Sequence, residues 1–224
     1  MTAMTPLLCN DPGDFGRVGL LIGGDSAERE VSLDGGAAIA RSFKRSGIAF
    51  DVYDGAPALF NAINAGKVNR VFNLMHGPGG EDGAIQGALQ LMGIPVTGTG
   101  VLGSALSMDK LQSKRLLLQQ GLPTTDFILI GPREMAFDTV GQTFGFPVFV
   151  KPTGLGSSIG VSRVVDEAGL PEAVALARQY GDEVIVEPEI RGSEYFAGVI
   201  GRTVLPLIRI ETPRAFYDYE AKYQ

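Results

Sequence analysis

The stretch RVGLLIGGDSAEREVSL, residues 17–33, sets the fold of the first half of the chain. Its apolar run at 17–24 is typical of a buried strand that ends in a Gly-Gly loop. Further strands are predicted at 49–55, 70–77 and 94–98, and helices at 37–47, 57–66 and 82–93. Because strands and helices alternate, we expect a doubly wound parallel sheet over the first hundred residues.

Ligands of such sheets bind at the carboxyl ends of the strands, which here carry two loops of interest. The loop DSAEREVSL (25–33) is typical of a helix N-terminus, where acidic residues are favoured by the helix dipole. Alternatively, one of its carboxylates binds an ammonium group in a cleft. The residues by themselves favour the first interpretation.

The second loop, HGPGGEDG (76–83), contains His76, the single histidine. Spacing alone does not decide between a structural role and a role as a base or substrate contact with Glu81 orienting the ring. A metal site is disfavoured, because there is no second histidine and the single cysteine lies far away at Cys9. Asp82 is expected to cap the helix that starts at Gly83.

The second half of the chain mixes hairpins with helices and is predicted to be α+β. Helices are predicted at 104–123 and 170–181, and strands at 146–152, 161–165, 183–190, 193–201 and 204–211. The last two strands are expected to pair in antiparallel fashion around a Gly-Arg-Thr turn. Boundaries are expected near 104–110 and near 190.

A glycine-rich loop, KPTGLGSSIG (151–160), lies between two of these strands. It is neither a Walker A loop nor a dinucleotide fingerprint, because no Gly-Lys-Ser/Thr closes it and a strand follows it. Its N–H groups, together with the hydroxyls of Ser157 and Ser158, could surround phosphate oxygens, and Lys151 could add a charge. Taken alone, the pattern favours an ordinary turn.

Composition excludes several classes of protein. The net charge is −6 and the pI is about 4.9, which argues against nucleic-acid binding. No apolar stretch is long enough for a membrane span, and the start of the chain does not have the pattern of a signal peptide. We therefore expect a soluble, cytoplasmic protein.

Five motifs occur in one order: GGDSAEREVSL, HGPGGEDGAIQG, TGTGVLGSALSMDK, FPVFVKPTGLGSSIG and FYDYEAKY. From residue 17 to the last residue the chain resembles bacterial D-alanine–D-alanine ligases of the ATP-grasp superfamily. The resemblance implies a leader at 1–16, a pre-ATP-grasp domain at 17–106, a central ATP-grasp subdomain at 107–190 and the start of a C-terminal subdomain at 191–224. That last subdomain would be incomplete.

The activity that the resemblance implies is the joining of two D-alanines, with ATP hydrolysed to ADP and phosphate, for peptidoglycan synthesis. The carboxylate of the first D-alanine would take the γ-phosphoryl group, and the amine of the second would displace phosphate. A homodimer is also implied, with no nucleic-acid or membrane partner.

The resemblance also implies roles for individual residues. Glu28 would bind the ammonium of the first substrate, with Ser157 and Tyr223 linked to it in closing a loop over the site. His76, with Glu81, would lie near the substrate carboxylates. ATP would be bound through Lys110, Lys151, Gly156, Ser158, Glu187, Ile190, Glu194 and Lys222. Among these, Glu187 and Glu194 would hold the ribose or adenine, and Ile190 would lie at the adenine edge.

The sequence departs from the family pattern in two ways. Pro188 stands where many relatives have a lysine near the adenine. The arginine and the Asp and Glu-x-Asn magnesium ligands that follow the tyrosine loop in the family are not found in these 224 residues. We therefore expect an N-terminal part of a ligase, or a truncated product, with negligible phosphate release when purified as it stands.

Two alternatives remain at this point. One is a non-catalytic remnant that binds a nucleotide or a D-amino acid. The other is a D-alanine–D-lactate ligase, although the tyrosine at position 223 favours an amine acceptor.

Overall fold

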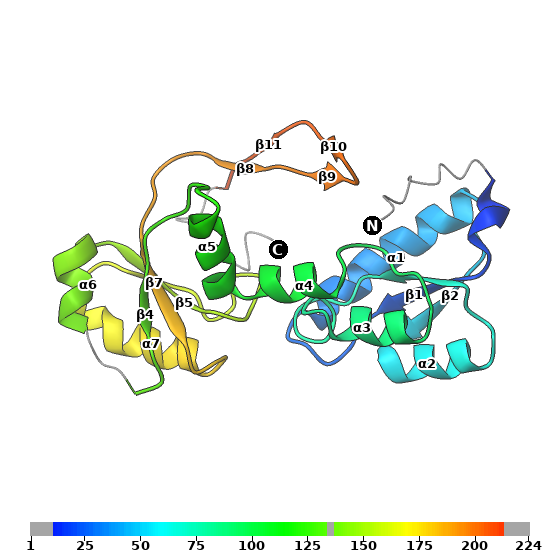
Figure 1. The fold of residues 1–224 in the computed structure, drawn as a ribbon, viewed down its shortest axis with the longest axis horizontal. Coiled ribbons are helices and arrows are strands. Elements are labelled where there is room, and N and C mark those ends of the chain that lie inside the picture. The colour runs from blue at the N-terminus through cyan, green and yellow to red at the C-terminus, as the bar shows by residue number, and fades with distance from the viewer. Residues whose placement is uncertain (1–10, 134–136, 213–224) are drawn as a thin grey trace. The chain divides into compact units, whose positions relative to one another are not determined.

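The computed structural model describes residues 11–133 and 137–212 of the chain. The chain divides into two compact units, Met1–Met108 and Asp109–Gln224, and each has its own hydrophobic core. Figure 1 shows the first unit in blue to green and the second in green to red. No helix among the described residues is both long and apolar enough to cross a membrane.

The first unit is built on a three-stranded parallel sheet with the order β2-β1-β3. Its strands are β1 (Val18–Ile22), β2 (Phe50–Asp54) and β3 (Arg70–Asn73), and a short 3-10 helix (Pro12–Phe15) precedes them. Its helices are α1 (Arg29–Arg45), α2 (Ala56–Asn64), α3 (Ala84–Leu91) and α4 (Val101–Met108). Figure 1 shows α1 on one side of the sheet and α2 with α3 on the other, which confirms the predicted doubly wound sheet.

The central strand β1 is buried on both faces because helices cover both sides of the sheet. Leu21 packs into the core that contains Leu59 of α2. Leu20 lies in register with Phe72 of β3, whose ring centroid is 5.4 Å from that of Phe43 in α1. Successive side chains of a strand point to opposite faces, so a strand between two helical layers is apolar throughout. This is why the apolar run of β1 was recognisable in the sequence.

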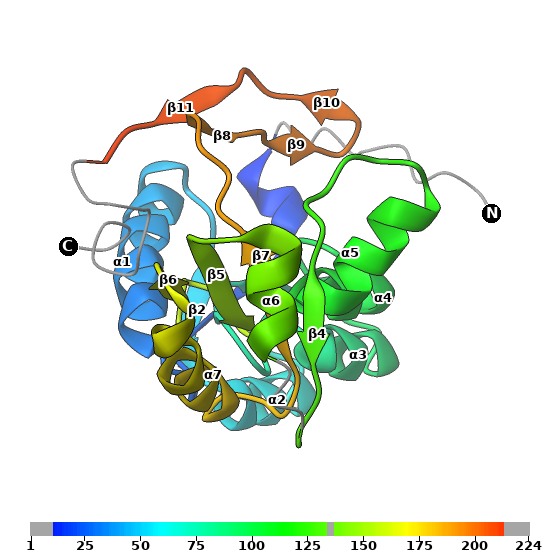
Figure 2. The same ribbon diagram turned by 90° about the vertical axis from the view of Figure 1, so that its left-hand side faces the viewer.

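The second unit contains a four-stranded antiparallel sheet with the order β4-β7-β5-β6. The strands are β4 (Ile128–Ile130), β5 (Val148–Pro152), β6 (Ser162–Val164) and β7 (Val184–Pro188). The helices are α5 (Lys110–Gln119), α6 (Phe137–Phe144) and α7 (Leu170–Arg178), with a short 3-10 turn (Glu167–Gly169) before α7. Figure 2 shows α6 and α7 in front of this sheet, and Figure 1 shows α5 on its other side.

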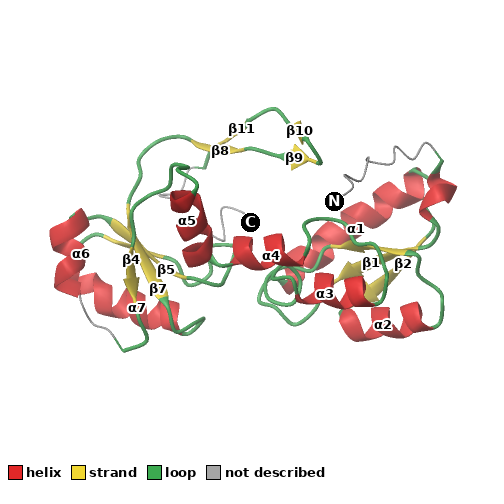
Figure 3. Cartoon of the chain, viewed as in Figure 1, coloured by secondary structure: helices red, strands yellow, loops and turns green. Residues whose placement is uncertain are grey.

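A long hairpin follows the sheet and is broken into short pieces. β8 (Glu194–Phe196) pairs with β11 (Ile208–Ile210), and β9 (Val199–Ile200) pairs with β10 (Thr203–Val204). Figure 3 shows these strands separated by loops. The antiparallel pairing agrees with the prediction, but the two continuous strands do not form. Pro206 lies in one gap and cannot donate to the ladder.

Three other predicted elements differ in the structure. The helix predicted at 37–47 already begins at Arg29. The predicted strand at 94–98 is only an isolated bridge between Val96 and Val71. The predicted helix at 104–123 is two helices, because Asp109 between them is extended and its carboxylate accepts a hydrogen bond of 2.9 Å from the N–H of Gln112. An aspartate that caps a new helix ends the preceding one.

The two neighbouring glycines of α1 provide a matched stability test. A Cβ at Gly36 would lie 2.5 Å from Cγ2 of Ile22 in β1, whereas a Cβ at Gly35 would meet nothing within 4 Å. We expect Gly36→Ala to destabilise the chain by about 1–3 kcal/mol through overpacking. We expect Gly35→Ala to stabilise it by up to about 1 kcal/mol, because alanine favours helices over glycine.

The midpoints of urea unfolding of the parent chain and the two variants measure this difference. Shifts of the same sign and size for both variants would contradict the proposed close contact between α1 and β1.

Candidate functional site

Glu28 lies at the start of α1, directly after the loop that follows β1. It is the N-cap residue of α1 and is only 2% exposed. The neighbouring Arg29 fixes this loop, since its guanidinium contacts both carboxylate oxygens of Asp54 at 2.6 and 2.5 Å and the carbonyl of Gly24 at 3.1 Å. A charged pair that ties β2 to the loop therefore sets the position of the neighbouring Glu28.

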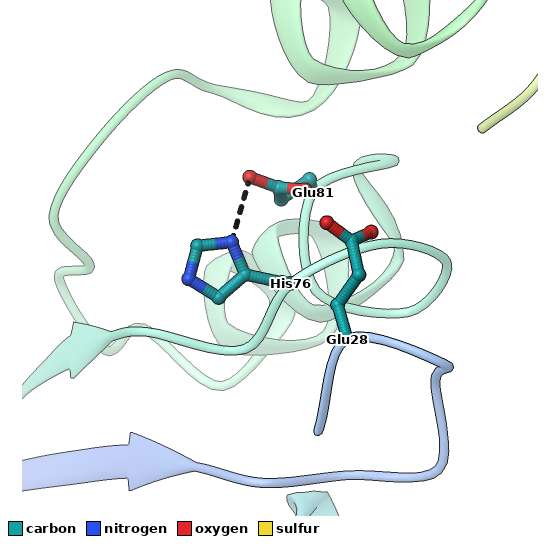
Figure 4. A group of neighbouring side chains, drawn as sticks. All are labelled: Glu28, His76 and Glu81. Carbon is teal, nitrogen blue, oxygen red and sulfur yellow. Dashed lines mark ion pairs between the residues drawn. The ribbon is translucent and has the colours of Figure 1, made fainter. Parts of the chain in front are cut away.

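His76 and Glu81 lie in the loop after β3 and face Glu28, as Figure 4 shows. The Nδ1 of His76 is 3.6 Å from Oε1 of Glu81. The other carboxylate oxygen of Glu81 accepts a hydrogen bond of 2.8 Å from the N–H of Gly77. Gly77 has a φ of 67°, and a Cβ there would lie 2.9 Å from the carboxylate of Glu28. The loop can approach Glu28 this closely because position 77 is glycine.

The carboxylate of Glu81 controls the ionisation of His76. Its close contact with the ring raises the pKa of His76 above the ordinary 6.5, although burial opposes this, and His76 in turn lowers the pKa of Glu81 below 4.5. A raised histidine pKa stabilises the fold below pH 6.5, and a lowered glutamate pKa stabilises it above pH 4.5. The pair therefore stabilises the fold fully between pH 4.5 and pH 6.5. This stabilisation is lost as the pH rises through the raised pKa of His76 or falls through the lowered pKa of Glu81.

The cluster can attract a positively charged group. Glu28, His76 and Glu81 offer ligand atoms that all lie within 4.8 Å of one another, a spacing that a metal ion could span. Two carboxylates beside an imidazole can equally attract an organic ammonium group.

A polar cavity of about 350 Å³ adjoins His76 and Glu81. Gln86 in its wall is buried and donates from Nε2 to the carbonyl of Gly80 at 2.9 Å. Its Oε1 has no hydrogen-bond partner among the described residues. Because a buried acceptor without a partner is unfavourable, this oxygen is available to a small polar ligand or to water.

The loop at Asp82 differs in detail from the expectation. Its carboxylate accepts hydrogen bonds from the N–H groups of Gly79 at 2.8 Å and Ala84 at 3.0 Å. The N-cap position of α3 is held by Gly83 in a left-handed conformation. Asp82 therefore accepts a hydrogen bond from the first N–H of α3, although it lies one position before the N-cap residue.

The second unit contains a larger pocket of about 560 Å³, within the range of about 300–1,000 Å³ common for small-molecule sites. It lies on the face of the sheet opposite to the core. Its walls include eight residues that the sequence analysis assigned to nucleotide binding or closure: Lys110, Lys151, Gly156, Ser157, Ser158, Glu187, Ile190 and Glu194. Tyr223 and Lys222, assigned to the closing loop, lie outside the described residues.

The glycine-rich loop is the hairpin connection between β5 and β6, as predicted. Ser157 and Ser158 have φ values of 51° and 60°, a region that non-glycine residues seldom occupy. Such backbone strain persists only where the surroundings hold it, and it is common at binding sites. The ammonium of Lys110 donates to the carbonyl of Leu155 and so holds the loop against the pocket.

Glu187 lies in the floor of the pocket and contacts two lysines. Its Oε2 contacts Nζ of Lys151, and its Oε1 is 3.0 Å from Nζ of Lys114. Burial raises the pKa of Glu187, but the two lysines outweigh that effect, so the pKa lies below its ordinary 4.5. The carboxylate therefore stays ionised at neutral pH although it is largely buried.

The sequence analysis missed Lys114. Lys114 is 6% exposed. Among the described residues of the second unit, it is the one lysine or arginine that is buried. One signal was present, because Lys114 follows Lys110 by four positions in a helix and so lies on the same helical face. Nothing in the spacing showed that this face turns toward Glu187.

An antiparallel sheet with a lysine-lined pocket under a glycine-rich hairpin, after a doubly wound unit, defines a nucleotide-dependent enzyme of the ATP-grasp class. Family models described as D-ala D-ala ligase N-terminus and C-terminus match residues 54–99 and 116–224. The chain belongs to the D-alanine–D-alanine ligase family.

Similar proteins and structures support this assignment. D-alanine–D-alanine ligase B of Xanthomonas campestris is 44% identical over 99% of this chain and 71% of its own length. The ligase of Halorhodospira halophila is 47% identical over 96% of this chain and 69% of its own length.

Among solved structures, the Bacillus anthracis ligase superposes with a TM-score of 0.78 and 32% identity, covering 93% of this chain and 68% of its own. The structure of the Bacillus anthracis ligase complexed with ATP gives a TM-score of 0.77 and 30% identity over 90% of this chain and 68% of its own.

The single histidine allows a direct test of the His76–Glu81 pair. We expect Glu81→Gln to move the titration of the His76 ring to lower pH, because the neutral amide no longer favours the protonated ring. Proton NMR of the ring C–H signals across pH measures this pKa. Asp82→Asn is the matched control and should leave it within experimental error. An unchanged titration in Glu81→Gln would show that Glu81 does not control the ring.

Proposed function

We propose that this chain serves the ATP-dependent ligation of two D-alanines to D-alanyl-D-alanine, the reaction for which its relatives are named, in peptidoglycan synthesis. The 224 residues by themselves are still expected to have negligible activity, because no magnesium ligand is assigned within them. The observation that carries the proposal is the geometry of the two sites. One places paired carboxylates beside a histidine, and the other places lysines under a glycine-rich hairpin. These are the charges that an amino acid and a nucleoside triphosphate require.

In the first unit, Glu28 receives the ammonium of the first D-alanine. The buried carboxylate has the charge for this role, and Glu81 and His76 are close by. The carboxylate of Glu81, 3.6 Å from Nδ1 of His76, favours the protonated ring, so the ring can carry positive charge near the substrate carboxylate. The same group of residues thus matches both ends of an amino acid.

In the second unit, the pocket receives ATP. Lys110 and Lys151 contact the phosphates, and the N–H groups at Gly156 and Ser158 add donors from the loop. Glu187 and Glu194 contact the ribose or adenine, with Ile190 at the adenine edge. The fit rests on the donor set, since the pocket is lined by two lysines, by the backbone of the glycine-rich loop and by two carboxylates.

The proposed chemistry is transfer of the γ-phosphoryl group from ATP to the carboxylate of the first D-alanine. The amine of the second D-alanine then attacks the acyl phosphate, and inorganic phosphate leaves. Ser157 assists closure over the site, because exclusion of water protects an acyl phosphate from hydrolysis. Magnesium supplies charge neutralisation on the phosphates when bound, and no magnesium ligand is assigned within these residues.

The subdomain boundaries at 106/107 and 190/191, a homodimer, and a cytoplasmic location are part of the same proposal. Each follows from the family resemblance.

The nucleotide site is tested by ATP binding. We expect the 224-residue chain to bind ATP, and Lys110→Met to weaken binding about ten- to a hundredfold, since a charged hydrogen bond contributes about 1.5–3 kcal/mol. Isothermal titration calorimetry measures both constants. Lys67→Met removes an exposed lysine of the first unit and should bind ATP like the parent. A parent chain that binds no ATP would refute the nucleotide site.

The amino-acid site is tested by D-alanine binding. We expect D-alanine to shift the His76 ring signals in NMR and L-alanine to do so less, because the site is chiral. Glu28→Gln should abolish the shift, since the amide cannot neutralise the ammonium. Glu30→Gln, at an exposed acid two positions later, is the control and should respond like the parent. Equal responses of Glu28→Gln and the parent would exclude Glu28 as the ammonium ligand.

A further inference from the structure

Lys114 is buried beneath the nucleotide pocket and does not line it. Its ammonium makes three contacts: Oγ1 of Thr124 at 2.9 Å, Oγ1 of Thr125 at 2.6 Å, and Oε1 of Glu187 at 3.0 Å. Three contacts match the three N–H donors of a lysine. The side chain is only 8% exposed, so it cannot reach a ligand and can act only through its neighbours.

The carboxylate of Glu187 is divided between two lysines. Oε1 faces Lys114, and Oε2 faces Lys151, whose side chain is 25% exposed and lines the pocket. Two lysines and one carboxylate leave a net charge of one positive unit. A pair of Glu187 with Lys151 alone would be neutral. Lys114 thus supplies the charge that Glu187 would otherwise cancel at the pocket floor.

We propose that Lys114 is the positioning residue of the nucleotide pocket: by holding one oxygen of Glu187, it leaves Lys151 with an effective positive charge for the polyphosphate of the ligand. This inference rests on the proposed function, because it takes the pocket to bind a nucleoside triphosphate. It adds a buried residue, outside the pocket wall, that sets how strongly the pocket attracts phosphate. The uncharged base and ribose should be indifferent to it.

The physical basis is the distance dependence of charge interactions in a partly buried site. Water screens the pocket floor less than an exposed surface, so one unit of charge next to the pocket lysine changes the binding energy of a polyphosphate appreciably. The alternative is a purely structural role, in which Lys114 only fills and stabilises the space beside Phe127, whose ring centroid is 5.6 Å from its Nζ. A structural role would affect charged and uncharged ligands alike.

Three variants separate these roles by charge. Lys114→Met removes the buried cation at nearly constant shape and leaves the Glu187–Lys151 pair neutral. Glu187→Gln raises the net charge to two positive units. The double variant Lys114→Met/Glu187→Gln restores one positive unit and leaves no buried charge without a partner.

The experiment measures the dissociation constants of ATP and adenosine for the parent chain and the three variants. Calorimetry is done at low salt with EDTA, so that no divalent cation contributes. The readout is the preference for ATP, which is the dissociation constant of adenosine divided by that of ATP. Both ligands contain the base and the ribose, so the contacts of Glu187 with these groups cancel in the ratio. We expect this preference to fall about tenfold in Lys114→Met, which corresponds to about 1.4 kcal/mol. It should return to within about threefold of the parent in the double variant and rise in Glu187→Gln.

An unchanged preference in Lys114→Met, or an equal fall in the double variant, would overturn the inference and leave Lys114 a structural residue. If Lys114→Met does not fold, Glu187→Gln and the double variant decide, because their preferences must still differ in the stated order. A parent chain that binds neither ATP nor adenosine would refute the proposed nucleotide site, and the inference with it. A parent that prefers ATP, with variants that do not change that preference, refutes the inference alone.

Discussion

The alternation of side chains along β5 and β7 is the constraint on which the second unit depends. Val148 and Val150 of β5, like Val184 and Val186 of β7, face the core under α6 and α7. Phe149, Lys151 and Glu187 lie on the opposite face of these strands and line the pocket. Because a strand has a period of two, a slip of one residue in this pairing would bury the lysine and expose the valines. The core and the pocket are therefore fixed by the same register.

This register also explains how a glutamate is tolerated in an almost buried position. Phe149 lies opposite Glu187 in the antiparallel pair, and Lys151 is two positions further along the same face. A buried carboxylate without partners is strongly unfavourable, and removing one partner of a buried pair is costly. Here α5 covers the same face and brings Lys114 to the second oxygen. The charge at the pocket floor is thus set by residues of three elements that are remote in sequence.

In the first unit, the constraint on which the site depends is the close approach of backbone segments to their neighbours. Glycines at 36 and 77 allow α1 to pack on β1 and the His76 loop to approach Glu28. The loop at 25–28 is held by the Arg29–Asp54 pair. Of the two interpretations of DSAEREVSL, the helix N-terminus is confirmed, and the binding of an ammonium group stays a prediction. Glu28 is the N-cap residue of α1, yet its side chain makes no capping hydrogen bond and lies beside His76 and Glu81. The helix begins at Arg29, earlier than the predicted residue 37.

The sequence by itself determined the doubly wound first unit, the glycine-rich hairpin and the family, because apolar periodicity and glycine position are local signals. It did not determine where continuous patterns break. Asp109 divides a predicted helix and Pro206 interrupts a predicted strand, since a cap or a missing donor overrides a weak propensity. Nor did it show Lys114, whose role depends on which helical face meets which strand. Only the tertiary structure decided that a lysine on α5 and a lysine on β5 share one carboxylate, because contacts between remote elements follow from packing and not from spacing along the chain.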